Sequence, residues 1–269
     1  DSLMQVADII RESIDDVDPF IPGSFCACDG DIRHAGPISR ALAGKDKPRV
    51  IRINNARYLS PELRSFPRRM YSGAGQIAAL AADAGEDITV LAETDTCPHN
   101  RYSTGANLLH THYTGSILEG CHGAKHWITR LHSYQPGSGA AYREVLSTHQ
   151  GFYQTLFRAV QESEPSGYAA AVLPSTPFFN HAPDLCSSIS SWGTWSDLMG
   201  VLGLPCNFAR MPDLPAMMTG AEVELFSDDD LRQLLTKGLL LDGRAAEMLC
   251  QRGFSAEIGV VAKPWSGRR

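Results

Sequence analysis

The stretch ITVLAETDTCPHNRYS at residues 88–103 predicts a buried strand that runs directly into a dense polar loop. Its first half is apolar and partly β-branched, which favours a strand over residues 88–93. That strand ends in Glu93. In parallel α/β folds the carboxyl ends of the strands carry the active site, so this stretch predicts both a sheet strand and a candidate site.

Strand and helix patterns alternate on both sides of this stretch, after a first helix at residues 3–17. Repeated β–α units imply a parallel sheet with right-handed crossovers, in either a doubly wound fold or a barrel. We expect strands at residues 20–28, 49–54, 88–93 and 124–131, and helices at residues 35–43, 68–84, 104–118 and 140–163.

A Glu-Pro-Ser-Gly sequence at residues 164–167 separates a second, smaller α/β region, so we expect domains at residues 1–165 and 166–269. In this region Ser227 is expected to cap a helix, and Asp242 is interpreted as a turn and cap residue rather than a ligand group. The predicted strands cover residues 168–173, 206–209, 238–242 and 258–262, and the predicted helices cover residues 192–202, 227–235 and 244–251.

Composition narrows the possible partners. The 269 residues carry a net charge of -6, which argues against a nucleic-acid or anionic-membrane partner because such surfaces need a basic face. No apolar run reaches the length of a transmembrane helix. Seven cysteines without a framework spacing favour a reduced, cytoplasmic protein.

Polar and aromatic residues follow all four strands expected in the first region, which favours a sugar site. Sugars are held by directional hydrogen bonds to their hydroxyl groups and by aromatic stacking on their apolar faces. The alternative for Glu93 is a structural carboxylate, paired for example with Arg101. The candidate sugar-binding residues are Asn54, Asp95, His99, Asn100, Arg101, Tyr102, Trp127 and His132.

A metal or cofactor site is not expected. Cys26, Cys28, Cys97 and His99 have suitable side chains for zinc, but the Cys-x-Cys spacing is not the usual one for a zinc site. The sequence also contains no GxGxxG, Walker A or GxSxG pattern. We therefore expect neither a metal nor a bound cofactor.

The segment LAETDTCPHNRYS, the following helix and EGCHGAKHWITRLHS resemble the seventh and eighth strands of a clan-A glycoside hydrolase barrel. The resemblance is to the β-galactosidase-like family 42 group. It implies the C-terminal half of a (β/α)8 barrel, strands five to eight, with Glu93 as the catalytic nucleophile and Trp127 stacking on the sugar. It also implies a flavodoxin-like second domain, similar to glutamine amidotransferases but without their chemistry, and a homodimer or homotrimer.

The family's general acid/base lies in an Asn-Glu pair, and no Asn-Glu pair occurs in this sequence. The resemblance therefore implies an acid/base upstream of residue 1 and a chain that is part of a longer protein. The leading hypothesis is a retaining glycosidase acting on a β-galactoside or a related glycoside. The alternatives are a non-catalytic carbohydrate-binding or assembly protein, and a doubly wound hydrolase or transferase that uses Asp29 or Asp31 with Glu93.

Overall fold

The computed structural model divides the chain into two compact units, Asp1–Glu164 and Pro165–Arg269. The sequence places this boundary between residues 165 and 166. The structure describes residues 2–27, 32–53, 74, 77–78, 80, 88–96, 104–128, 137, 139–164, 166–171, 199, 202–209, 211–218 and 220–262.

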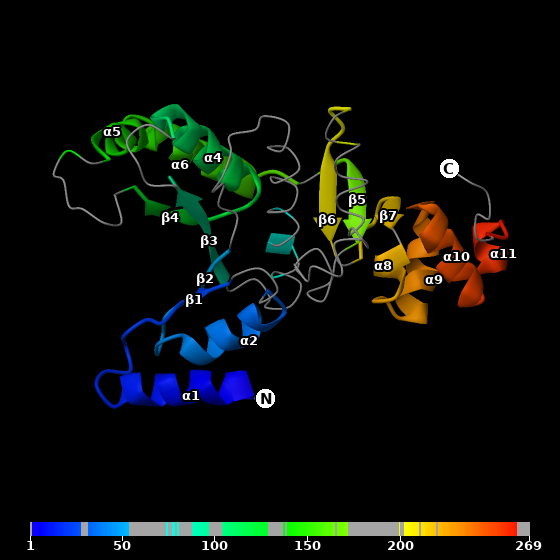
Figure 1. Ribbon diagram of the computed structural model, residues 1–269, viewed down its shortest axis with the longest axis horizontal. Coiled ribbons are helices and arrows are strands. Elements are labelled where there is room, and N and C mark those ends of the chain that lie inside the picture. The colour runs from blue at the N-terminus through cyan, green and yellow to red at the C-terminus, as the bar shows by residue number, and fades with distance from the viewer. Residues whose placement is uncertain are drawn as a thin grey trace. The chain divides into compact units, whose positions relative to one another are not determined.

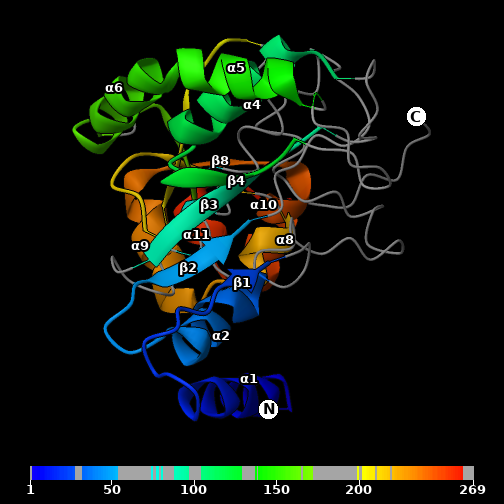
Figure 2. The ribbon, with the colours of Figure 1, turned by 90° about the vertical axis from the view of Figure 1, so that its left-hand side faces the viewer.

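The first unit contains a parallel four-stranded sheet whose spatial order, β1-β2-β3-β4, follows the chain order. Figure 2 shows these strands side by side. The strands are β1 (Phe25–Cys26), β2 (Arg49–Arg52), β3 (Ile88–Asp95) and β4 (Gly123–Trp127). The described helices are α1 (Ser2–Asp15), α2 (Ile32–Leu42), α4 (Ala106–Leu118), α5 (Ala140–Thr148) and α6 (Gln150–Gln161).

Helices cover this sheet through a continuous set of contacts. α1 packs on α2, which contacts β1 and β2, while α4 contacts β3 and also packs against α5 and α6 (Figure 1). The core below these helices includes Ile51, Ile53, Val90 and Ala92, whose exposed fractions are 0 to 1%. Burial of these apolar side chains stabilises the unit and fixes which face of the sheet lies inward.

The second unit has its own parallel sheet in the order β6-β5-β7-β8, so the strand order reverses between β5 and β7. Phe226, Leu231, Leu234 and Leu249 are the large side chains of its core. Its elements are β5 (Tyr168–Ala171), β6 (Cys206–Ala209), β7 (Ala216–Met218), α8 (Gly220–Val223), α9 (Asp228–Lys237), β8 (Leu239–Leu241), α10 (Gly243–Gln251) and α11 (Ser255–Ile258).

Both predicted caps in the second unit are confirmed. The Ser227 hydroxyl accepts a hydrogen bond from the Asp230 amide at the start of α9, at 3.1 Å. The Asp242 carboxylate accepts one from the Ala245 amide at the start of α10, at 2.7 Å. These bonds satisfy amides that a helix leaves without a partner in its first turn.

The predicted single helix at residues 140–163 is wrong, because the chain turns at His149 between α5 and α6. Ser147, Thr148 and Gly151 around the turn are all weaker helix formers than alanine or leucine. The His149 ring also stacks on His110 of α4, with centroids 4.1 Å apart. Weak local propensity and this contact together explain the break.

Three strand predictions also need correction. Residues 258–262 form no strand: α11 ends at Ile258, and Gly259 adopts a left-handed conformation with φ 69° that closes the helix. The strands expected at 20–28 and 124–131 are regular only over Phe25–Cys26 and Gly123–Trp127 among the described residues. β7 was not predicted, because Ala216–Met218 has no β-branched residue and, buried on both faces, no alternation.

The fold is mixed α/β, and the described residues form two parallel sheets. Within the described ranges, no helix has the length and apolar character needed to cross a membrane.

Candidate functional site

The candidate site lies at the carboxyl end of the first sheet, where the strand register brings together side chains from distant parts of the chain. Arg52 of β2 pairs with Leu91 of β3. Farther along β3, Glu93 pairs with Lys125 of β4. Leu91 and Glu93 are two residues apart and so point to the same face, which places Arg52, Glu93 and Lys125 on one face of the sheet, with Arg52 two residues short of the Glu93–Lys125 pair.

Two contacts on the opposite face establish which way Glu93 points. Thr94 contacts the Nδ1 atom of His126, and the His126 ring packs edge-on against Tyr113 of α4 with centroids 4.9 Å apart. Thr94 therefore faces α4. Successive side chains of a strand point to opposite faces, so Glu93 and Asp95 lie on the face turned away from α4.

Glu93 forms an ion pair with Arg52, from Oε2 to the Nη1 atom of the guanidinium. The two side chains are 14% and 12% exposed, so the pair is largely removed from water. Desolvation of two charges is costly, and their attraction offsets that cost only while both partners are present. Arg52 of the neighbouring strand thus holds the Glu93 carboxylate in place. Both roles considered for Glu93, a structural carboxylate and a nucleophile, require such a fixed position.

Asp95 of β3 pairs with Trp127 of β4, two residues beyond the Glu93–Lys125 pair and on the same face of the sheet. Asp95 is buried, whereas Trp127 keeps 41% of its surface exposed. The backbone around the tryptophan is fixed, because the Trp127 carbonyl accepts hydrogen bonds from the amide and the hydroxyl of Thr96, at 3.3 and 3.0 Å. An exposed indole on this fixed stretch of backbone, beside a carboxylate, is suited to stacking on an apolar ligand face.

The structure therefore brings together three of the predicted site residues, Glu93, Asp95 and Trp127. The other predicted binding residues lie outside the described part of the chain, and their placement stays a prediction. They are Asn54, His99, Asn100, Arg101, Tyr102 and His132.

Sequence reasoning missed Arg52 and Lys125. The β2 sequence RVIR places an arginine at its last position, and the register pairs that position with Leu91 of β3, two residues before Glu93. The arginine at the end of β2 is visible in the sequence, but its place beside β3 can be inferred only when the strand pairing is known. Cys26 pairs with Arg52 and so belongs to this face as well.

Cys26 bears on the zinc alternative, since it is exposed and has no disulfide partner. Cys28, Cys97 and His99, its possible co-ligands, lie outside the described residues. No group of three or more metal-ligating side chains is found within the part of the chain that the structure describes.

Taken together, this face offers a held carboxylate, a second buried carboxylate, two cations and an exposed indole. A carboxylate of this kind can act as a nucleophile, a base or a partner for a cation. The indole and the charged groups can hold a polar ligand that has one apolar face.

No family model, curated protein or solved structure matches this chain.

We expect the Arg52–Glu93 pair to be strongly coupled. Arg52→Met should lower the free energy of unfolding by about 3 kcal/mol, because it leaves the Glu93 charge without this partner in a site with little water. The double variant, Arg52→Met with Glu93→Gln, should lose clearly less than the sum of the two single variants. Urea unfolding of the four proteins measures the coupling.

The matched control is an exposed pair. Lys237 and Asp213 lie 3.6 Å apart with side chains 42% and 96% exposed. Lys237→Met should change the free energy of unfolding by less than about 1 kcal/mol. Additive losses at Arg52 and Glu93 would show that the pair does not interact as described.

A second prediction concerns pH and the histidines behind the sheet. Burial lowers the pKa of His126, and burial together with the neighbouring His149 lowers the pKa of His110. The unfolded chain therefore binds these protons more readily than the folded one, so stability is complete above the ordinary histidine pKa and falls as pH drops below it.

Replacing His126 with asparagine should reduce the loss of unfolding free energy between about pH 7.5 and about pH 5.5, because one of these two groups no longer titrates. His110 still titrates, so part of the loss should remain. Urea unfolding at both pH values provides the measurement. An equal loss in both proteins would contradict the link to His126.

Proposed function

We propose that the protein is a retaining glycoside hydrolase that acts on a β-galactoside or a related glycoside, with Glu93 as its nucleophile. The observation that carries the proposal is the register of β2, β3 and β4. It places Glu93, Asp95 and Trp127 on one face at the strand ends, with Glu93 held by Arg52. Carboxylates beside an aromatic platform are the groups that glycoside cleavage uses.

The topology of the two sheets supports the finer fold assignment that we propose. In the first unit the strand order follows the chain order without reversal, as in part of a (β/α)8 barrel. We therefore assign β1–β4 to strands five to eight of such a barrel. The order β6-β5-β7-β8 is that of the first four strands of a flavodoxin-like sheet, which supports a flavodoxin-like second domain.

In the proposed reaction a Glu93 carboxylate oxygen attacks the anomeric carbon as the glycosidic bond breaks. A second carboxyl group, about 5–5.5 Å away, donates its proton to the leaving oxygen. The resulting ester between Glu93 and the sugar is then attacked by water, which gives a proton back to the second carboxylate. Glu93 leaves as a carboxylate, so charge and protons balance over the cycle.

The described residues have separate parts in this scheme. Arg52 orients Glu93 for attack from the face turned away from α4. Trp127 supplies the surface for the apolar side of the sugar ring. The family's acid/base lies in an Asn-Glu pair, which this sequence does not contain, so we assign that role to none of the described carboxylates. From the same family resemblance, we also propose that the protein forms a homodimer or a homotrimer.

A second candidate function is carbohydrate binding without hydrolysis. The Arg52–Glu93 ion pair favours it, since a carboxylate held by a guanidinium is also an ordinary structural feature. In that case Trp127 and Asp95 would hold a sugar and no glycosyl ester would form. The two candidates differ in one observable, which is turnover of a glycoside.

The test uses the protein as its source makes it, with a panel of aryl glycosides that includes an aryl β-galactoside. Turnover of at least one member is expected. Glu93→Gln should lower kcat at least about a thousandfold while the protein stays folded, because the nucleophile is lost and the shape is kept. Circular dichroism checks the fold.

The matched control is Glu162→Gln, an exposed carboxylate at the end of α6. It should leave kcat and KM unchanged. Unchanged activity in Glu93→Gln would sink the assignment of the nucleophile. A silent panel, combined with saccharide binding that Trp127→Ala abolishes, would favour the binding protein instead.

A further inference from the structure

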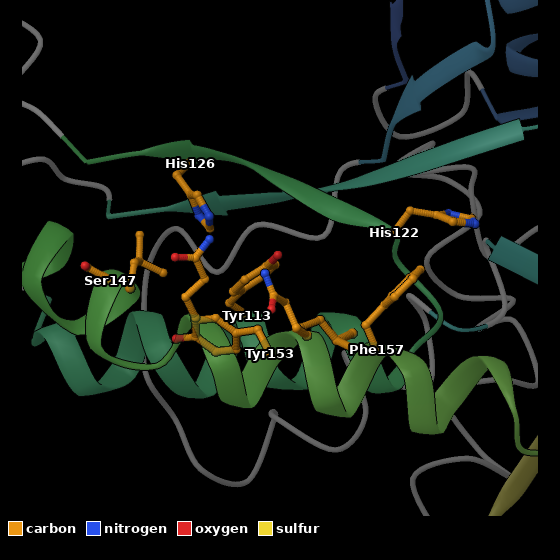
Figure 3. A pocket seen from close by; sticks show the side chains of 10 residues that line it. Tyr113, His122, His126, Ser147, Tyr153 and Phe157 are labelled. Atoms are coloured by element: carbon orange, nitrogen blue, oxygen red, sulfur yellow. The ribbon is translucent and has the colours of Figure 1, made fainter.

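A pocket of about 500 Å³ lies on the other side of the first sheet, between β4 and the helices α4, α5 and α6. Figure 3 shows His126 descending from β4 toward Tyr113 of α4 and Tyr153 of α6, with Ser147 and Phe157 at opposite ends. This is the face that Thr94 and His126 share, so the pocket is separated from Glu93 by the sheet itself. The volume lies within the range of small-ligand sites.

The described lining combines aromatic and aliphatic side chains with a smaller polar part. It contains no arginine, lysine, aspartate or glutamate. Burial, together with the neighbouring Tyr113, raises the pKa of Tyr153 to about 12, so its phenol stays neutral. Burial also lowers the pKa of His126, which favours its neutral form. The described lining residues are Tyr113, Ile117, His122, His126, Leu146, Ser147, Gln150, Tyr153, Gln154 and Phe157.

The walls of the pocket are held in place by contacts that leave its centre open. The Tyr153 hydroxyl bonds to His110 Nδ1 at 2.8 Å, and the Tyr153 ring packs edge-on against Tyr113 with centroids 4.7 Å apart. His122 Nδ1 accepts the Val90 amide at 3.1 Å, so the neutral His122 ring carries its hydrogen on Nε2. A preorganised wall lowers the entropy lost when a ligand binds.

Other polar groups on this lining are available to a ligand. Ser147, Gln150 and Gln154 are exposed, on α5 and α6. A primary amide both donates and accepts hydrogen bonds, as a hydroxyl does. Within the described ranges, no protein partner is seen for the Tyr113 hydroxyl, although its ring is packed on both sides.

We propose that this pocket is a second ligand site, which binds a neutral mono- or disaccharide away from the face of Glu93. The absence of charge in the described lining disfavours phosphorylated and acidic ligands, whose transfer from water would not be compensated. Groups that both donate and accept match sugar hydroxyls, and the aromatic rings match the apolar face of a sugar. A flat heteroaromatic ligand would use fewer of these groups, since its polar atoms lie only along its edge.

The described lining of this pocket includes no residue of the proposed catalytic face, so a saccharide can bind here whether or not the protein hydrolyses glycosides. The pocket adds a site at which a saccharide is retained without being cleaved.

The test follows the NMR signals of the His126 ring during titration of the full chain with galactose, glucose, lactose and maltose. At least one sugar should shift these signals to saturation. The double variant Gln150→Ala with Gln154→Ala should weaken that binding at least about tenfold, because hydrogen bonds from both amides are lost. Gln154→Trp, which fills the pocket, should abolish it.

The matched control is Gln161→Ala, an exposed glutamine at the end of α6 that does not line the pocket. It should leave the affinity unchanged. Adenosine serves as the flat heteroaromatic probe. The saccharide proposal is overturned if no sugar shifts the His126 signals, if adenosine alone does, or if sugar binding survives both pocket variants.

Trp127→Ala separates this proposal from the one for the catalytic face. It removes the stacking surface beside Asp95 but none of the lining of the pocket. Sugar-dependent shifts of His126 should persist in Trp127→Ala, whatever happens to turnover. Loss of those shifts in Trp127→Ala would show that the sugar binds at the strand ends only.

Discussion

Strand β3 is paired along both edges, in register with β2 on one side and β4 on the other, and this pairing positions the described site residues. A shift by one residue would turn Glu93 toward α4 and move Val90 and Ala92 out of the core, since side chains alternate between the two faces. The exposed fractions of Val90 and Ala92, 1% and 0%, show how firmly one face is committed to the interior. The apolar half of β3 thus determines where its polar half points.

The ion pair between Arg52 and Glu93 is costly as a source of stability alone. Well-packed apolar side chains at such positions often stabilise a protein equally well or better. The pair holds the Glu93 side chain, 14% exposed, in one position, which both a nucleophile and a structural carboxylate require. The pocket behind the sheet has the opposite character, with hydrogen-bonding and aromatic groups but no formal charge in its described lining.

Local features of the fold could be predicted from the sequence, whereas features that depend on which strands pair could not. The alternation of strands and helices, the caps at Ser227 and Asp242, and the strand that ends near Glu93 follow from short-range patterns. The partner of Glu93 does not, because Arg52 lies 41 positions earlier and only the strand register brings it close. The same limit applies to the turn at His149, which depends on stacking with His110, and to β7, whose burial between two strands removes any alternation.

The most direct test of Glu93 as a nucleophile is to trap the glycosyl ester. The protein as its source makes it is incubated with a 2-deoxy-2-fluoro glycoside carrying a good leaving group, then digested and analysed by mass spectrometry. The fluorine slows both formation and hydrolysis of the ester, and the good leaving group keeps formation the faster step, so a labelled peptide should accumulate. If Glu93 is the nucleophile, a single sugar label should be found on Glu93. A label on another carboxylate, or none on a protein that turns over the parent glycoside, would contradict that assignment.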